Sequence, residues 1–301
     1  MQLPKLLRIV FIALLTASLN SGAQDRIPVI LDADTGNEVD DAYALTRALI
    51  EPSWNVLALN ATQWQTSHWT IEDSMENSYR LNSMILSHLD LDIPNKRGGA
   101  ARMYDWGDQA QHSAAAYEII KQAQAMPEGE KLTVIALGAL TNVASAVYIE
   151  PSIESKMHVY WLGTTYDFDQ GILQKRDFNC VMDIQAIDFM LHSSVEMSIM
   201  PVSVASAMKF YWDETERELK GKHPISDFML DRWYTHLDSG RKERTIWDLA
   251  LISVMLFPEW GEKVDITTSK DNGGRVIHYY KSIEADKIRN EFFEQMRLLA
   301  Q

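Results

Sequence analysis

Short apolar runs rich in β-branched residues alternate along this chain with segments whose apolar residues recur at helical spacing. Strands that alternate with helices are typical of a largely parallel sheet, because each helix returns the chain to the edge where the next strand starts. Five strands are expected: Ile27 to Leu31, Asn55 to Ala61, Leu132 to Leu137, His158 to Leu162 and Met197 to Val204. Five helices are expected between them: Asp41 to Ile50, Ile71 to Ser87, Ala114 to Ala125, Leu140 to Tyr148 and Ile184 to His192. The sequence therefore predicts an α/β fold with an open, mostly parallel sheet and helices on both of its faces.

The pattern changes after Val204, where helical segments predominate as far as Phe257. A hairpin is expected over Val264 to Tyr280, followed by a last helix over Glu284 to Leu299. The sequence thus predicts added C-terminal helices and a hairpin after the parallel part of the sheet. Because no Pro/Gly/Ser-rich linker, charge block or internal repeat divides the chain, we expect residues 24–301 to form one domain.

The first residues have the layout of a cleaved secretory signal. Lys5 and Arg8 precede the apolar run Ile9 to Leu15, and small residues follow up to Ala23. A membrane anchor is a weaker interpretation, since a spanning helix needs about 20 mostly apolar residues. We expect residues 1–23 to be removed, leaving a secreted or periplasmic protein that is not held in a membrane.

Charge and cysteine content exclude several classes of protein. The formal net charge is −14, and loss of Lys5 and Arg8 would make it −16, which disfavours nucleic acid as a partner but not a small neutral substrate. Cys180 is the only cysteine, so no intramolecular disulfide can form and the fold must depend on its apolar core. We expect a buried, unreactive thiol at this position.

An acidic loop follows the first predicted strand. Its five carboxylates lie within ten residues: Asp32, Asp34, Glu38, Asp40 and Asp41. Their repulsion would be costly without a cation, and hard oxygen ligands favour Ca²⁺ or Mg²⁺. Asp40 and Asp41 could instead merely favour a helix N-terminus, but that explanation leaves Asp32 and Asp34 unexplained.

Two other families with acidic loops fit the sequence less well. An EF-hand counted from Asp32 would require glutamate where Tyr43 stands. A phosphatase of the haloacid dehalogenase type would use Asp32 and Asp34 in an Asp-x-Asp-x-Thr motif, together with a later lysine and a further acidic pair. A phosphatase-like hydrolase built on these two residues remains an alternative.

The loop more closely resembles the signature Asp-x-Asp-Pro-Gly-x-Asp-Asp-Ala of the calcium-dependent nucleoside hydrolases. Thr35 replaces the proline, and two extra residues separate Gly36 from the Asp40-Asp41 pair. Further similar segments follow in the family's order: Leu91 to Pro94 with Gly98 to Ala100, Ala136 to Ala144, Asp177-Phe178-Asn179 with Asp183 and Ala186, and Trp247-Asp248-Leu249-Ala250. The chain is thereby identified as a divergent secreted member of the inosine/uridine-preferring nucleoside hydrolase family, with a nucleoside hydrolase-like, Rossmann-like sheet.

The resemblance implies a calcium site and a catalytic base. Calcium would be held by Asp34, Asp41, the main-chain carbonyl of Leu137 and Asp248. Asp40 would be the general base, and Asp32 would support the loop from behind.

The resemblance also implies how a ribonucleoside substrate would be bound. Asp177, Asn179 and Asp248 would hold the ribose, and Gln65 and Trp247 would contact the substrate. Trp247 stands where many members keep a histidine that protonates the leaving base, so His236 and Tyr234 become candidates for that role.

The function implied is calcium-dependent hydrolysis of the N-glycosidic bond of ribonucleosides, which releases free base and ribose. A calcium- and ribonucleoside-binding protein without turnover is a further alternative. Members of this family are commonly dimers or tetramers, so a homodimer or homotetramer is expected.

Overall fold

The computed structural model describes residues 26–66, 73–236 and 240–301. The expected signal segment, residues 1–23, and the first part of the helix expected from Ile71 lie outside the described residues. Within the described parts, every helix is too short or too polar to cross a bilayer.

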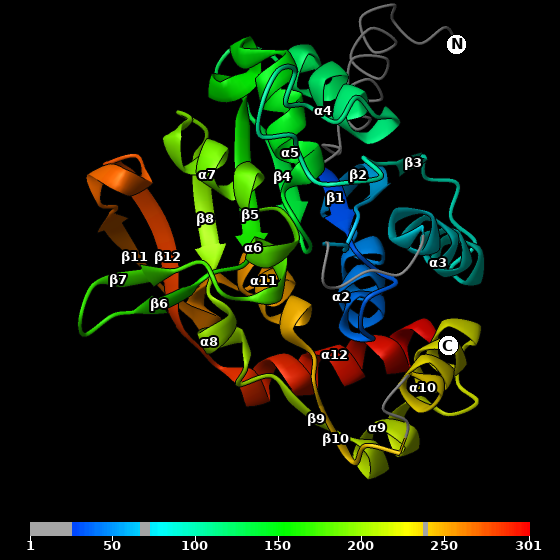
Figure 1. The fold of residues 1–301 in the computed structure, drawn as a ribbon. Coiled ribbons are helices and arrows are strands. Elements are labelled where there is room, and N and C mark those ends of the chain that lie inside the picture. Colours follow the sequence, from blue (N-terminus) through cyan, green and yellow to red (C-terminus); the bar gives the residue numbers. More distant parts are fainter. Residues whose placement is uncertain (1–25, 67–72, 237–239) are drawn as a thin grey trace, which may run out of the picture.

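An eight-stranded sheet forms the centre of the molecule, with helices on both faces (Figure 1). The strand order is β11-β12-β8-β5-β4-β1-β2-β3. The strands are β1 (Ile27–Ala33), β2 (Trp54–Ala61), β3 (Asn95–Arg97), β4 (Leu132–Ala136), β5 (Met157–Leu162), β8 (Glu196–Met200), β11 (Gly261–Thr267) and β12 (Val276–Ile283). Every neighbouring pair is parallel except β11 and β12. The predicted fold class is confirmed.

Side chains of the sheet alternate between two apolar cores. In β1, Val29 and Leu31 pack into one core, whereas Ile30 packs into the other. The first core lies against α2 (Asp40–Leu49), α3 (Ser74–His88), α10 (Pro224–Thr235), α11 (Trp247–Leu256) and α12 (Ala285–Leu299). The second lies against α4 (Ala114–Ala125), α5 (Thr141–Ile149) and α7 (Ile184–His192). Burial on both faces explains why the central strands are almost continuously apolar.

The C-terminal hairpin joins the main sheet. Strand β12 pairs in parallel with β8, and β11 closes that edge in the antiparallel direction. Helix α12 then returns to the first core, where Phe292 contacts Tyr43 of α2 at 5.5 Å between ring centroids. The carboxylate of Glu291 lies 2.8 Å from the guanidinium of Arg47, and this buried ion pair also joins α12 to α2.

One predicted strand is shorter than expected. The strand predicted over Met197 to Val204 ends at Met200, since Pro201 has no N–H to continue the ladder and α8 (Val202–Ala205) begins after it. The structure also contains two small antiparallel ribbons that the sequence pattern did not predict. One pairs β6 (Thr165–Asp167) with β7 (Ile172–Gln174), and the other pairs β9 (Lys209–Tyr211) with β10 (Glu243–Thr245). The remaining helices are α6 (Phe178–Met182) and α9 (Trp212–Leu219), with short 3-10 turns at Pro151–Lys156, Pro258–Trp260 and Lys270–Asn272.

Candidate active site

A pocket of about 740 Å³ opens at the carboxyl ends of the central parallel strands. Ligands of open α/β sheets bind at this edge, because the loops that leave neighbouring strands converge there. The acidic loop after β1 forms one wall, and residues that follow β4 and β5 form another. The lining residues are Asp34, Gly36, Asn37, Glu38, Asp40, Asp41, Trp64, Asn77, Leu137, Leu162, Asp177, Phe178, Asn179, Val202, Arg232, Thr235, His236, Trp247 and Asp248.

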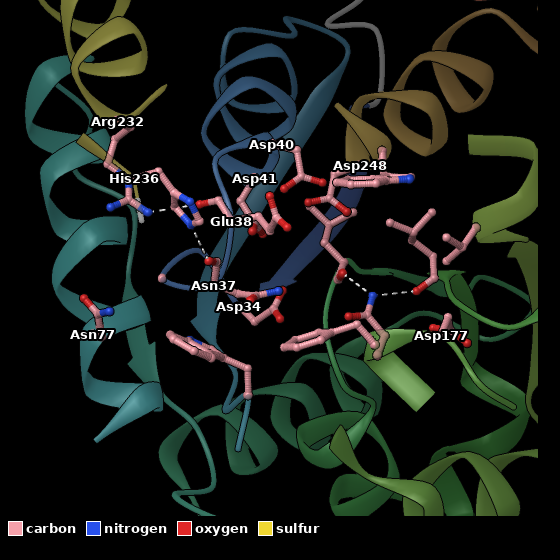
Figure 2. Close-up of a pocket in the computed structure, with 18 of the residues that line it drawn as sticks. Asp34, Asn37, Glu38, Asp40, Asp41, Asn77, Asp177, Arg232, His236 and Asp248 are labelled. Atoms are coloured by element: carbon pink, nitrogen blue, oxygen red, sulfur yellow. Dashed lines mark hydrogen bonds between the residues drawn. The ribbon is translucent and has the colours of Figure 1, made fainter. Parts of the chain in front are cut away.

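Three buried carboxylates meet in the pocket. One oxygen from each of Asp40, Asp41 and Asp248 lies within 4.8 Å of the others (Figure 2). Asp40 and Asp41 open α2, and Asp248 is the second residue of α11, which packs against α2. Both helices thus point their N-termini, where the backbone dipole favours anions, at the same place.

The electrostatics of this cluster require a compensating charge. Burial raises the pKa of Asp34, Asp40, Asp41 and Asp248 well above the ordinary carboxyl value, and repulsion between these carboxylates raises each pKa further. The buried Oδ2 of Asp34 and Oδ1 of Asp41 have no hydrogen-bond partner. Buried anionic oxygens that are mutually repelled and partly unpaired fit a hard divalent cation.

Asp32, in strand β1, is fully buried and does not line the pocket. The side-chain amide of Asn142 donates to its Oδ1 at 2.8 Å. Burial raises the pKa of Asp32 to about 7, and the hydrogen bond from Asn142 opposes that rise. This placement suits the supporting position expected for Asp32.

The turn after β4 approaches the acidic loop closely. A Cβ atom added to Gly138 would lie 2.8 Å from Cγ of Asp34, so a side chain at this position would displace the carboxylate. The preceding residue, Leu137, lines the pocket, and its carbonyl accepts a 2.7 Å hydrogen bond from Nδ2 of Asn179. The same amide donates to the Leu162 carbonyl at 2.9 Å. Asn179 therefore joins the ends of β4 and β5 at the pocket wall.

Asp177 and Asn179 both line the pocket, as expected of residues that contact substrate. Asp177 caps α6, where its Oδ1 accepts from the backbone N–H of Cys180 at 3.3 Å. Its Oδ2 is buried without a hydrogen-bond partner, and burial raises its pKa. One carboxylate oxygen of Asp177 is therefore available to a ligand.

The structure does not bring Gln65 to the pocket wall. Its side chain donates to the carbonyl of Ala100 at 2.6 Å, whereas its neighbour Trp64 lines the pocket. Trp64 and Phe178 belong to one small apolar cluster. Trp247 also lines the pocket, so the described part of its walls includes the rings of Trp64, Phe178 and Trp247. Tyr234, one of the two candidates for a leaving-group acid, is exposed and outside the lining.

Helix α10 supplies pocket residues that sequence analysis assigned weakly or missed. Arg232 donates from Nη2 to the carbonyl of Glu38 at 3.0 Å, and His236, just after the helix, donates from Nε2 to the carbonyl of Asn37 at 3.0 Å. Figure 2 shows Glu38 between this pair and the acid cluster. The two extra residues in the acidic loop were the sequence signal for this contact. A longer loop at the edge of a pocket extends toward neighbouring elements, and here its backbone carbonyls accept hydrogen bonds from Arg232 and His236. Asn77 on α3 had no comparable signal.

Fold and site together define an α/β protein whose ligand pocket holds a carboxylate cluster suited to a divalent metal. The chain belongs to the inosine-uridine preferring nucleoside hydrolase family, whose model matches residues 29–295. It is therefore an enzyme that hydrolyses N-glycosyl compounds, and its substrates are nucleosides.

Known relatives are similar over most of their length. A pyrimidine-specific ribonucleoside hydrolase of Escherichia fergusonii is 22% identical over 289 residues, which cover 84% of this chain and 89% of the relative. A purine-preferring ribonucleoside hydrolase from Gardnerella vaginalis has the same fold, with a TM-score of 0.66 and 18% identity over 91% of this chain and 99% of that one. A plant nucleoside hydrolase, PpNRh1, aligns with a TM-score of 0.70 and 15% identity over 90% and 99% of the two chains.

Proposed function

We propose that this protein hydrolyses the N-glycosidic bond of ribonucleosides in a calcium-dependent reaction that releases free base and ribose. The observation that carries the proposal is the cluster of the buried carboxylates of Asp40, Asp41 and Asp248 in the wall of the pocket. Calcium accepts six to eight oxygen ligands in flexible geometry, which suits carboxylates from a loop combined with a main-chain carbonyl. Histidine and cysteine, which softer metals prefer, are not among the residues of this cluster.

Asp34, Asp41, Asp248 and the Leu137 carbonyl are the proposed calcium ligands. When bound, the ion supplies the positive charge that lets these carboxylates stay ionised together, and it acidifies water held beside the sugar. Asp40 is the proposed general base, which takes the proton of the attacking water. One oxygen of Asp40 lies within 4.8 Å of an oxygen of Asp41 and of Asp248, so variants of Asp34 and Asp40 have to be compared to test which carboxylate is the ligand and which is the base.

The ribose is held, in this proposal, by Asp177, Asn179 and Asp248. The unpaired Oδ2 of Asp177 is suited to accept from a sugar hydroxyl. Substrates without the 2′-hydroxyl should react poorly, because a buried polar group that has lost its partner costs about 1–3 kcal/mol.

A panel of ribonucleosides tests this function. Purified protein is incubated with each nucleoside, with added Ca²⁺ or with a chelator, and free base and reducing sugar are measured. Base release that requires Ca²⁺ supports the proposal. Phosphate release from a monoester would instead favour the phosphatase-like alternative, and nucleoside affinity without turnover would favour a binding protein.

Export and assembly are further parts of the proposal. Lys5, Arg8 and the apolar run after them support a cleaved signal and a secreted or periplasmic location. The family's common dimers and tetramers support a homo-oligomer. N-terminal sequencing of the protein from the exported fraction and light scattering of the purified enzyme test these two expectations.

A further inference from the structure

Helix α3, which packs beside β2 and α2 (Figure 1), presents a row of polar side chains to the interior of the protein. Ser74, Ser78 and Asn82 recur at intervals of four residues, so they lie on one face of the helix, and all three are fully buried. A buried polar group costs free energy unless it forms a hydrogen bond. The partners of this row therefore indicate its role. The first of them is the backbone N–H of Trp64, which donates to Oγ of Ser74 at 3.1 Å.

The other two members of the row bind the acidic loop. Oδ1 of Asn82 accepts a hydrogen bond of 2.5 Å from the hydroxyl of Thr35, and Oγ of Ser78 accepts one of 3.3 Å from the backbone N–H of Gly36. Gly36 permits this close approach, because a Cβ atom there would lie 2.8 Å from Nδ2 of Asn77 on the same helix. Helix α3 thus holds two consecutive residues of the loop.

Thr35 and Gly36 are the central residues of a turn that starts at Asp34. The backbone N–H of Asn37 closes this turn by donating to the carbonyl of Asp34 at 2.8 Å. A proline at the second position of such a turn would fix φ near −65°, whereas threonine leaves φ free to vary. Thr35 stands where the nucleoside hydrolase signature has that proline. The hydrogen bond to Asn82 supplies a restraint that the covalent structure of this turn lacks.

The turn determines where the carboxylate of Asp34 lies. Asp34 lines the pocket, and its Oδ2 is buried without a hydrogen-bond partner. The turn after β4 packs against it closely, since a Cβ atom on Gly138 would lie 2.8 Å from Cγ of Asp34. Because no hydrogen bond holds Oδ2, the direction of this carboxylate depends on the backbone of its own turn.

We propose that Thr35 and Asn82 are positioning residues for the metal ligand Asp34, because their hydrogen bond fixes the turn that carries its carboxylate. The inference rests on the proposed function for the identity of the bound ion. Neither side chain lines the pocket, so both act through the backbone of the acidic loop. Residues that orient a metal ligand from behind contribute about 10–100-fold to metal affinity.

Calorimetric titration with Ca²⁺ tests the role of the Thr35 hydroxyl. Thr35→Val removes the hydroxyl but keeps the shape of the side chain, and it should raise the Kd for Ca²⁺ by about tenfold. Thr35→Ser keeps the hydroxyl and should keep the wild-type Kd. An unchanged Kd in Thr35→Val would overturn the inference. An equal rise in Thr35→Ser would also overturn it, because the effect would then come from packing of the methyl group.

Thr46→Val is the matched control for this titration. Thr46 is fully buried, and its hydroxyl donates to the carbonyl of Ala42 at 2.6 Å within α2, the helix that begins with Asp40 and Asp41. The variant therefore loses the same group near the metal site while the acidic loop keeps its contacts, and the Kd for Ca²⁺ should not change. A rise as large as that in Thr35→Val would overturn the specific role of the Thr35 hydroxyl.

A double-mutant cycle tests whether the two side chains act as a pair. Asn82→Leu should raise the Kd for Ca²⁺ about as much as Thr35→Val does, since either change breaks the same hydrogen bond. The double variant should raise the Kd no further than each single variant. Effects that multiply in the double variant would show that the two residues act independently, and would overturn the pairing.

Hydrogen exchange of the ion-free protein provides a readout that needs neither calcium nor turnover. The amides of Gly36 and Asn37, which bond to Ser78 and to the Asp34 carbonyl, should exchange about tenfold faster in Thr35→Val than in the wild type. Thr46→Val should keep the wild-type rates. Equal rates in Thr35→Val would overturn the inference. If the wild-type protein binds no Ca²⁺, the proposed function fails, but these exchange rates still decide whether α3 fixes the turn.

Discussion

Asp40 is the residue at which the assignment of roles can be tested most directly. Replacing it with asparagine keeps the size of the side chain but removes its basicity. We expect Asp40→Asn to lower kcat by at least about a hundredfold, because general-base catalysis contributes on the order of 10²–10⁴. Calcium affinity should be retained. Steady-state kinetics and calorimetric titration with Ca²⁺ measure the two quantities.

The matched variant is Asp34→Asn, which changes the other carboxylate that could serve as base. We expect this variant to lose calcium affinity, since Asp34 is a proposed ligand whose Oδ2 is buried without another partner. The opposite result, with calcium lost in Asp40→Asn and retained in Asp34→Asn, would exchange the two roles. The grouping of Asp40 with Asp41 and Asp248 makes this comparison necessary.

At the scale of elements, α12 is attached to α2 by a buried ion pair. The side chains of Arg47 and Glu291 are 3% and 9% exposed, and Glu51 also pairs with Arg47. Glu291→Gln should lower the free energy of unfolding by roughly 3 kcal/mol, because Arg47 would keep a buried charge with weaker compensation. Urea unfolding measures the change. Glu294→Gln, an exposed position on the same helix, should change it by less than about 0.5 kcal/mol.

The strands β5, β8 and β12 share a second group of titratable side chains. His158 lies 3.4 Å from Glu196, whose other oxygen contacts Lys131, and His278 stands on the adjacent strand. Burial, as the largest cause, lowers the pKa of His158 to about 4, and the nearby Lys263 contributes to the decrease.

This lowered pKa predicts a pH dependence of stability. In the unfolded chain, histidine takes up a proton near pH 6.5, whereas folded His158 stays neutral to about pH 4. Stability should therefore fall as the pH decreases from 6.5 toward 4. Between pH 7 and pH 5, His158→Gln should lose roughly 2 kcal/mol less than the wild type in urea unfolding. An equal loss in both would contradict the prediction, and the exposed His192→Gln serves as the control.

At the scale of the whole molecule, the ion site couples metal binding to stability. The buried carboxylates repel one another in the ion-free protein, so a cation that binds only the folded state should stabilise it. At calcium concentrations about a hundred times the Kd, stabilisation of about 2.7 kcal/mol is expected. This should raise Tm by several degrees in a calorimetric scan, and a chelator should reverse the rise.

Asp41→Ala provides the matched variant for this measurement. Removing one like charge should leave the ion-free protein as stable as the wild type or more so, while the calcium-induced rise in Tm disappears. A normal calcium response in Asp41→Ala would show that Asp41 is not a ligand.

The order of apolar segments and the acidic loop were enough to predict the architecture and the location of the chemistry. Alternation of apolar strands with helices requires a parallel sheet, and carboxylates that directly follow a buried strand must lie at its carboxyl edge. The family resemblance connected the acidic loop with Asp177, Asn179 and Asp248, all of which line one pocket.

Contacts between side chains that are distant in the chain became visible only in the folded protein. Local periodicity records which face of an element is buried, but not which neighbour covers it. The approach of α10 to Asn37 and Glu38, the orientation that brings Trp64 rather than Gln65 to the pocket, and the insertion of β12 beside β8 all depend on packing between remote segments. Such contacts are fixed by complementary shape and hydrogen bonding in the folded chain, which no single stretch of sequence contains.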